Sequence, residues 1–198
     1  MSVRATVASA PLPGARRTSP SGVSQPLCPR CEADLFPRSV TEEASMDPRN
    51  IYAATKVHQE HLCAAFARAC GAELIALRYH NVYGPRMPRL SSYAGVASIF
   101  WSALSSGQAP QVTEDGRQAR DFVHVSDVAR ANVAALTAPG GTQGAFNIAT
   151  GRPRSVLDLA CALATAFGPE APAPQVPGPT GSGTCATSLP RPDGPIGC

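Results

Sequence analysis

The sequence predicts an α/β fold with a parallel sheet. Segments with the 3.6-residue apolar period of a helix alternate with strand-length runs along residues 47–167. The run 72–80 is largely apolar, which is typical of a strand covered on both faces in a parallel sheet. Hydrophobic residues make up 43% of the 198 residues, which is enough for a core.

The first predicted helix covers the segment MDPRNIYAATKVHQEHLCAAFARACG. Asp47 is its expected N-cap, Pro48 takes the first helical position, and Gly71 ends it. Tyr52 and Lys56 then lie one turn apart on one face of the helix.

The middle of the chain alternates in the same way. The strand 72–80 is followed by a Gly-Pro pair, so residues 81–86 are expected in the loop at its carboxyl end. Residues 92–107 have the helical period. Residues 110–125 favour a hairpin that turns at an Asp-Gly pair.

The last predicted elements are a helix at 126–138, a strand at 144–150 and a helix at 155–168. Ser155 and Asp158 have the spacing of a capping box at the start of that last helix. Because helices and strands alternate to this point, a parallel sheet remains the best interpretation.

The chain divides by composition into three parts. Residues 1–25 are expected to be irregular, residues 26–175 to fold, and residues 176–198 to be disordered, because both ends are rich in Pro, Gly, Ser and Thr. The net charge of +3 is modest and the arginines are scattered, which argues against nucleic-acid binding. No apolar run reaches membrane-spanning length and no secretory signal is seen, so a cytoplasmic protein is expected.

The cysteines permit two interpretations. Cys28 and Cys31 have the spacing of half a zinc site, but no second pair lies nearby, so a plain loop is favoured and no metal is expected. Cys63, Cys70 and Cys161 fall inside predicted helices, where cysteine serves as a small apolar residue, so reduced core thiols are expected.

The pair of Tyr52 and Lys56 is the first candidate for catalysis. Lys56 is the one lysine among the 17 basic residues, the other sixteen being arginine. An ammonium close to a phenol favours the phenolate, and its compact donors suit a ribose hydroxyl better than a planar guanidinium does. The short pattern Y-x-x-x-K also arises by chance, and both residues could be ordinary helix positions.

Three sequence motifs, which follow one another along the chain, give the Tyr52–Lys56 pair a more specific interpretation. The segments PRNIYAATKVHQEHL, LRYHNVYGPR and RDFVHVSDVARANVAAL resemble those of the extended short-chain dehydrogenase/reductases, the NAD-dependent sugar-nucleotide epimerases and dehydratases. The chain looks most like the dTDP-L-rhamnose 4-epimerase and UDP-glucose 4-epimerase type. The resemblance covers residues 26–175 and implies the carboxyl half of a Rossmann-type, doubly wound sheet with a small substrate-binding part.

The resemblance also implies roles for individual residues. Tyr52 would take a proton from a sugar hydroxyl while hydride passes to NAD, and Lys56 would orient the nicotinamide ribose, with Tyr79 near the nicotinamide. A 4-keto sugar would rotate and be reduced on its other face. Asn81 and Arg120 would bind the substrate diphosphate, for which a guanidinium fork is well shaped.

The remaining polar residues of these motifs have milder interpretations. Arg86 is a further substrate-binding candidate, although it could be a solvated loop charge. His124 and Asp127 are expected to order the turn into the next helix rather than touch substrate. The partner implied by the resemblance is a nucleotide-diphosphate sugar, and members of the family are usually homodimers.

The chain also departs from the family pattern. It contains no glycine-rich G-x-x-G-x-x-G turn for the cofactor pyrophosphate and no counterpart of the family's catalytic Ser/Thr. We therefore expect a fragment that is truncated at its N-terminus and inactive alone. The segment PGPTGSGTCATSLPRPDGP, read from the third base of each codon, can spell T-G-x-Y-R-x-R-D-V-R-H-I-V-A-S-P-x-R-A, which matches the family's ending, so a frameshifted tail is expected.

Three alternatives remain open at this point. The chain could be an inactive truncated product that binds no cofactor, or part of a sugar-nucleotide 4,6-dehydratase or reductase of the same family. It could also be a small binding module organised by Cys28 and Cys31. The sequence does not identify the sugar.

Overall fold

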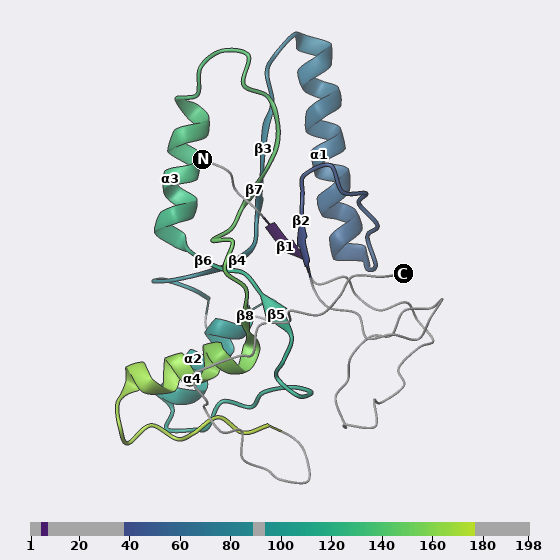
Figure 1. Ribbon diagram of the computed structural model, residues 1–198. Helices are drawn as coiled ribbons and strands as arrows, with labels where there is room; N and C mark the ends of the chain where they lie inside the picture. The colour runs from purple at the N-terminus through teal and green to yellow at the C-terminus, as the bar shows by residue number, and fades with distance from the viewer. Residues whose placement is uncertain (1–4, 8–37, 89–93, 177–198) are drawn as a thin grey trace. The chain divides into compact units, whose positions relative to one another are not determined.

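A computed structural model describes residues 5–7, 38–88 and 94–176 of the chain. These residues form two compact units (Figure 1). The sheet unit contains Ser39–Pro85 and Asp121–Pro153, and the helix-pair unit contains Arg86–Arg120 and residues 154–176. Three predictions fall outside the described residues. They concern the irregular start at 1–25, of which only a short strand at 5–7 is described, the Cys28 and Cys31 pair, and the tail at 176–198, of which only residue 176 is described.

The sheet unit contains most of the strands. Its elements are β1 (Ala5–Val7), β2 (Arg38–Val40, whose Arg38 falls outside the unit), α1 (Ile51–Cys70), β3 (Ile75–Tyr79), β4 (Asn81–Tyr83), β6 (Phe122–His124), α3 (Val125–Leu136) and β7 (Gly144–Ile148).

Parallel pairing joins the main strands of this unit. β3 pairs with β7 from Ile75 opposite Gly144 to Tyr79 opposite Ile148. β4 pairs with β6 from Asn81 opposite Phe122. The chain must cross over between the two strands of a parallel pair, and α3 lies in the connection from β3 to its partner β7. The predicted α/β class with parallel strands is confirmed.

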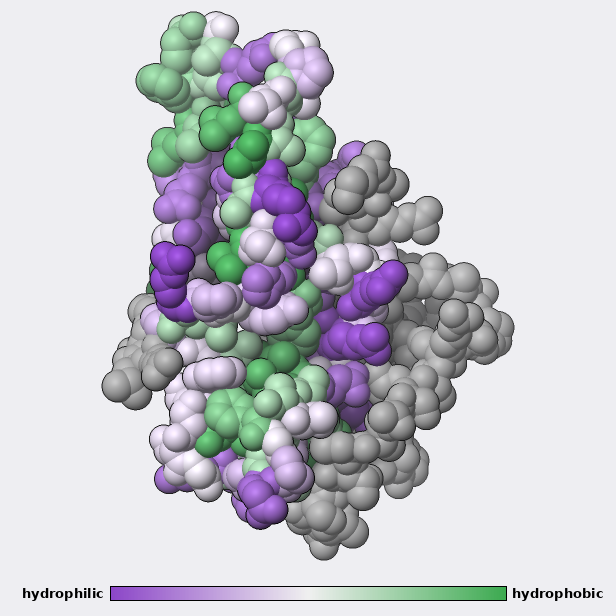
Figure 2. Space-filling view, turned by 90° about the vertical axis from the view of Figure 1, so that its left-hand side faces the viewer, coloured by the Kyte–Doolittle hydropathy of each residue, from purple (hydrophilic) through white to green (hydrophobic). Residues whose placement is uncertain are grey.

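Helices α1 and α3 lie on opposite sides of the β3–β7 pair (Figure 1). Two neighbouring residues of β3 form hydrogen bonds to the two helices: Arg78 donates to Glu60 of α1, and Tyr79 donates to Asn132 of α3. Figure 2 faces the α3 side and shows hydrophobic residues among hydrophilic ones. Val133 and Leu136 of α3 are both well exposed.

The helix-pair unit has its own small core. Its elements are α2 (Val96–Ser105), β5 (Ala119–Arg120), β8 (Arg154–Ser155) and α4 (Val156–Phe167), with β5 and β8 antiparallel. Helices α2 and α4 pack together, and the core contains Phe100, Val112, Val156 and Ala160. The predicted capping box is present, since Asp158 N–H donates to Ser155 Oγ and Ser155 N–H donates to Asp158 Oδ2.

Helix α1 begins later than predicted. Asn50, not Asp47, is the N-cap, because the Asn50 side chain accepts a hydrogen bond from the Ala53 N–H at 2.8 Å. Asp47 instead pairs with Arg49. Gly71 ends the helix in the left-handed conformation at φ 65°, as predicted.

Two strand predictions were wrong for the same reason. Residues 81–83 form strand β4 rather than a loop, because β6 supplies a partner. The predicted hairpin at 110–125 is absent: Gln111 of its first half bridges to Gln175, and in its second half β5 pairs with β8 and β6 pairs with β4, so both halves have partners distant in sequence. A turn does form, at residues 114–115, one residue before the predicted Asp115-Gly116.

The three helical cysteines are not reduced core thiols. Cys63 and Cys70 are free but exposed on α1. Cys161 is half-buried in α4 and disulfide-bonded. The prediction treated each cysteine as a small apolar residue, whereas α1 leaves most of its surface uncovered.

Asp121 fixes the loop at the carboxyl end of β7. It is fully buried, and its carboxylate accepts hydrogen bonds from the Thr150 N–H at 2.8 Å, the Thr150 hydroxyl at 2.9 Å and the Gly151 N–H at 2.7 Å. The half-buried His80 follows β3 at the same end. Burial lowers the pKa of His80 from its ordinary value, and the charge of Asp121 opposes that effect.

Replacing Asp121 tests this arrangement. Asp121→Ala leaves two backbone N–H groups without an acceptor, so we expect urea unfolding to show a loss of about 2–3 kcal/mol. Asp47→Ala is the matched control, because Asp47 forms an exposed ion pair and its loss should cost at most about 1 kcal/mol. Equal effects of the two changes would contradict the assignment.

The lowered pKa of His80 predicts acid sensitivity. Between the lowered folded pKa and the ordinary value of 6.5, the unfolded chain binds more protons than the folded chain, so stability falls as pH drops below about 6.5. Urea unfolding at about pH 7.5 and about pH 5.5 should therefore show a smaller loss in His80→Gln than in the parent. His58→Gln, on exposed α1, should keep the parental loss.

Candidate functional site

The structure places Tyr52 and Lys56 on one side of α1. Lys56 Nζ lies 5.5 Å from the centroid of the Tyr52 ring, and it also donates a hydrogen bond to Gln59 Oε1 at 3.3 Å. The Tyr52 side chain is 62% exposed. An ammonium this close to a phenol ring, with both groups open to solvent, can meet a ligand that binds along this side of the helix.

The local sequence explains this geometry. The Asn50 cap starts α1 immediately before Ile51, so Tyr52 lies in the first turn and Lys56 in the second. Successive positions four apart share a face of the helix with a rise of about 6 Å. The relation between the phenol and the ammonium is therefore set by the helix itself.

The structure places Tyr79 on the other side of the sheet. Its hydroxyl donates to Asn132 Oδ1 of α3 at 2.9 Å, whereas its neighbour Arg78 bonds to α1. Tyr79 and the Tyr52–Lys56 pair therefore lie on opposite sides of the β3–β7 pair. The role of Tyr79 near a nicotinamide stays a prediction.

Asn81 begins β4, directly after the carboxyl end of β3. Its backbone N–H and its side-chain amide both donate to the Asp121 carbonyl, at 3.1 and 3.4 Å. The Asn81 residue is exposed, and its side-chain oxygen accepts no hydrogen bond within the described part of the chain. An amide held in this way can present its oxygen or second N–H to a ligand.

Arg86 and Arg120 belong to the helix-pair unit. Arg86 is exposed, with a backbone φ of 67°, a strained value for a residue other than glycine. Arg120 is half-buried and donates to the Ala119 carbonyl at 3.1 Å and to Gln118 Oε1 at 3.3 Å. Because a guanidinium has five N–H donors, Arg120 keeps donors for an anionic ligand.

His124 and Asp127 order the start of α3, as the sequence suggested. The His124 ring accepts from the Ser126 N–H at 3.3 Å as the N-cap, and Asp127 lies in the first turn. The His124 ring also packs edge-on against Tyr83. Gly84 is required beside them, because a side chain there would meet Val125 Cγ1 at 2.6 Å.

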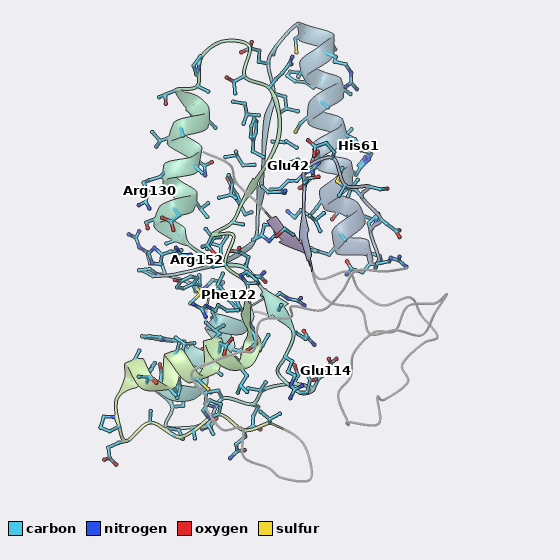
Figure 3. All side chains as sticks on the ribbon, viewed as in Figure 1. Glu42, His61, Glu114, Phe122, Arg130 and Arg152 are labelled. Atoms are coloured by element: carbon cyan, nitrogen blue, oxygen red, sulfur yellow. The ribbon has the colours of Figure 1, made fainter. Side chains whose placement is uncertain are left out.

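Sequence reasoning missed the polar residues that hold the strand ends and α1 in place. These are Asp121 and Arg78, together with Glu42, which lies on the segment after β2 (Figure 3). The signal for Arg78 was present: an arginine inside the apolar run IALRYH needs a carboxylate partner once that strand is covered. The burial of Asp121 depends on tertiary contacts and had no local signal.

Other classes of site find no support in the described ranges. They contain no group of three or more His, Cys, Asp or Glu residues that could hold a metal ion. None of their helices has the length and hydropathy that a bilayer span requires.

The chain is similar to known sugar-nucleotide epimerases. It is 39% identical over 131 residues to the dTDP-L-rhamnose 4-epimerase of Burkholderia thailandensis, a match that covers 66% of this chain but 36% of that protein. Among solved structures, it resembles a UDP-N-acetylglucosamine 4-epimerase from Methanobrevibacter ruminantium (32% identity, TM-score 0.63, 69% of this chain and 43% of that one).

A UDP-glucose 4-epimerase of Thermus thermophilus, solved as a complex with NAD, is also 32% identical, with a TM-score of 0.57 over 70% of this chain and 46% of that one. The chain thus spans less than half the length of these proteins. Residues 26–149, which hold Tyr52, Lys56, Asn81 and Arg120, match the family model directly. The chain belongs to the NAD dependent epimerase/dehydratase family.

Proposed function

We propose that this chain provides the proton-transferring and diphosphate-binding residues of an NAD-dependent epimerase that acts on a nucleotide-diphosphate sugar. The observation that supports the proposal most is the Tyr52–Lys56 pair, exposed on one side of α1 inside the region that matches the family. The relatives' names support 4-epimerisation as the reaction.

The described residues fit part of a cofactor site. The exposed Lys56 ammonium can donate hydrogen bonds to a ribose hydroxyl, and the exposed Tyr52 hydroxyl can lie beside a nicotinamide. NAD, when bound, would accept a hydride from the sugar and return it. The 198 residues hold no glycine-rich turn for the pyrophosphate, so the fit extends only to the nicotinamide end.

In the proposed mechanism, Tyr52 acts as the base and then as the acid. Its oxygen takes the proton of the sugar 4-hydroxyl as hydride leaves C4, and it returns a proton after the 4-keto sugar has turned its other face to the cofactor. Lys56 holds positive charge beside the phenol and so favours the phenolate. Asn81 and Arg120 would bind the diphosphate, leaving the sugar free to rotate.

The proposed partners are the nucleotide sugar and a second copy of the chain. Helix α1 supports the second, because Ile51, Leu62 and Phe66 share its face away from Glu60 and are 84%, 55% and 72% exposed. An apolar stripe of this kind stabilises a protein only when another surface covers it.

The isolated chain tests the cofactor proposal first. Because it has no glycine-rich turn, we expect the thermal unfolding midpoint of the 198-residue chain to be unchanged by NAD, since a ligand stabilises only a state that binds it. A rise of the midpoint with NAD concentration would show binding without that turn and would contradict this expectation.

The catalytic role needs a completed protein, in which residues from 26 onward follow the upstream segment of the Burkholderia thailandensis epimerase. We expect it to interconvert dTDP-L-rhamnose and its 4-epimer. Tyr52→Phe should lower turnover roughly 10²–10⁴-fold while sugar-nucleotide binding is kept. Tyr83→Phe is the matched control, because its ring packs on His124 and should keep turnover.

Three results would redirect the assignment. Near-parental turnover in Tyr52→Phe removes Tyr52 from the mechanism. Release of a 4-keto-6-deoxy sugar from UDP-glucose identifies a dehydratase, because UDP-glucose must lose its 6-hydroxyl as water to give that product. A folded, completed protein that neither binds NAD nor turns over either dTDP-L-rhamnose or UDP-glucose supports the inactive product.

A further inference from the structure

The Arg78 side chain joins three segments of the sheet unit. Its Nε donates to Glu60 Oε2 at 2.9 Å and its Nη2 to Glu60 Oε1 at 2.6 Å, which is a bidentate fork onto α1. Its Nη1 donates to the Glu42 carbonyl at 2.9 Å. One residue of β3 therefore holds both the middle of α1 and the segment that follows β2.

The Glu42 segment is itself fixed to the sheet. Glu42 Oε1 accepts from the Asn147 N–H of β7 at 2.9 Å, and the Asn147 side chain donates to the Val40 carbonyl at 3.4 Å. The Asn147 N–H points away from β3, so the segment occupies the outer edge of β7. The Glu42 carbonyl, which accepts the hydrogen bond from Arg78 Nη1, is therefore held in place by β7.

The ion pair between Arg78 and Glu60 is largely covered. Their side chains are 24% and 22% exposed. The hydrogen bonds from Arg78 lower the pKa of Glu60 despite partial burial, with a smaller contribution from His61 (Figure 3), and Glu60 raises the pKa of Arg78. Both groups are therefore charged at neutral pH, and the ion pair is a charge-assisted, bidentate contact.

Helix α1 has little else to fix its rotation. Ala67 is its one fully buried residue among the twenty, and four others are half-buried: Ala53, Val57, Glu60 and Ala64. Within the described part of the chain, its other side-chain hydrogen bonds stay inside the helix: Thr55 to the Tyr52 carbonyl, Lys56 to Gln59, and Cys70 to the Phe66 carbonyl. Small, weakly packed contacts resist rotation poorly, so the Arg78 fork is the directional contact.

Helical geometry transmits this constraint to the candidate catalytic pair. Tyr52, Lys56 and Glu60 are spaced by four residues, so each is turned by about 40° from the one before, on the same half of the helix. Because an α-helix is stiff over two turns, fixing the direction of Glu60 fixes the directions in which Lys56 and Tyr52 point.

We propose that Arg78 and Glu60 are positioning residues: the fork sets the rotation of α1 on the β3–β7 pair and thereby aims Tyr52 and Lys56. The inference rests on the proposed function for its catalytic consequence. The mechanical part, that the fork fixes α1, stands on the contacts alone.

Arg78→Lys in the completed protein separates positioning from stability. Lysine keeps the charge but cannot hold both Glu60 oxygens and the Glu42 carbonyl with one fixed fork. We expect kcat to fall about 10²-fold, the effect of a misplacement of about 1 Å, with KM for the nucleotide sugar within about threefold and an unfolding midpoint close to the parent. Arg130→Lys, in an exposed pair on α3, is the matched control and should keep parental kcat.

Parental kcat in Arg78→Lys overturns the inference. So does a fall in kcat that matches a loss of folded protein, because that result describes a stabilising ion pair only.

A distance measurement on the 198-residue chain decides the mechanical part without any activity. Spin labels go on Cys63 of α1 and on Leu136→Cys of α3, both exposed, with the other free cysteines replaced by serine and the disulfide of Cys161 kept. We expect one narrow distance distribution in the parent and a shifted or broadened one in Arg78→Lys, with unchanged helix content. An unchanged distribution overturns the inference even if the completed protein proves inactive, in which case the proposed function fails separately.

Discussion

The placement of α1 depends on one charged contact. The helix that holds the candidate catalytic pair buries one residue fully and half-buries four others, and a guanidinium fork from β3 orients it. A bidentate pair has a direction, which apolar contacts lack, so it can fix the rotation of a helix that packs loosely. The cost of covering two charges is offset by three hydrogen bonds from Arg78.

The carboxyl ends of the strands are organised by a second buried charge. Asp121 holds the loop after β7 through three hydrogen bonds, while its carbonyl receives both donors of Asn81. Polar groups at this edge thus have fixed partners inside the sheet unit, as expected where ligands bind at the carboxyl ends of parallel strands. By contrast, α1 and α3 leave apolar side chains exposed, and an exposed apolar surface is typical of a place where another surface binds.

Local sequence patterns predicted correctly the elements that have a clear apolar pattern or whose hydrogen-bond partners lie a few residues away. The strands at 75–79 and 144–148 and the capping box at Ser155 follow from apolar runs and from the side-chain spacing. The hairpin at 110–125 failed because β5 and β6 each pair with a strand distant in sequence, which a local turn signal does not encode. The Tyr52–Lys56 geometry was predictable because the helix alone sets it, whereas the side of the sheet on which Tyr79 lies was not.

The most direct measurement is a crystal structure of the completed protein with NAD bound. The account predicts that Lys56 Nζ lies at a hydrogen-bond distance of about 3 Å from a hydroxyl of the nicotinamide ribose, with the Tyr52 hydroxyl beside the nicotinamide ring. A nicotinamide bound on the α3 side of the β3–β7 pair, with Tyr52 and Lys56 facing solvent, would contradict it.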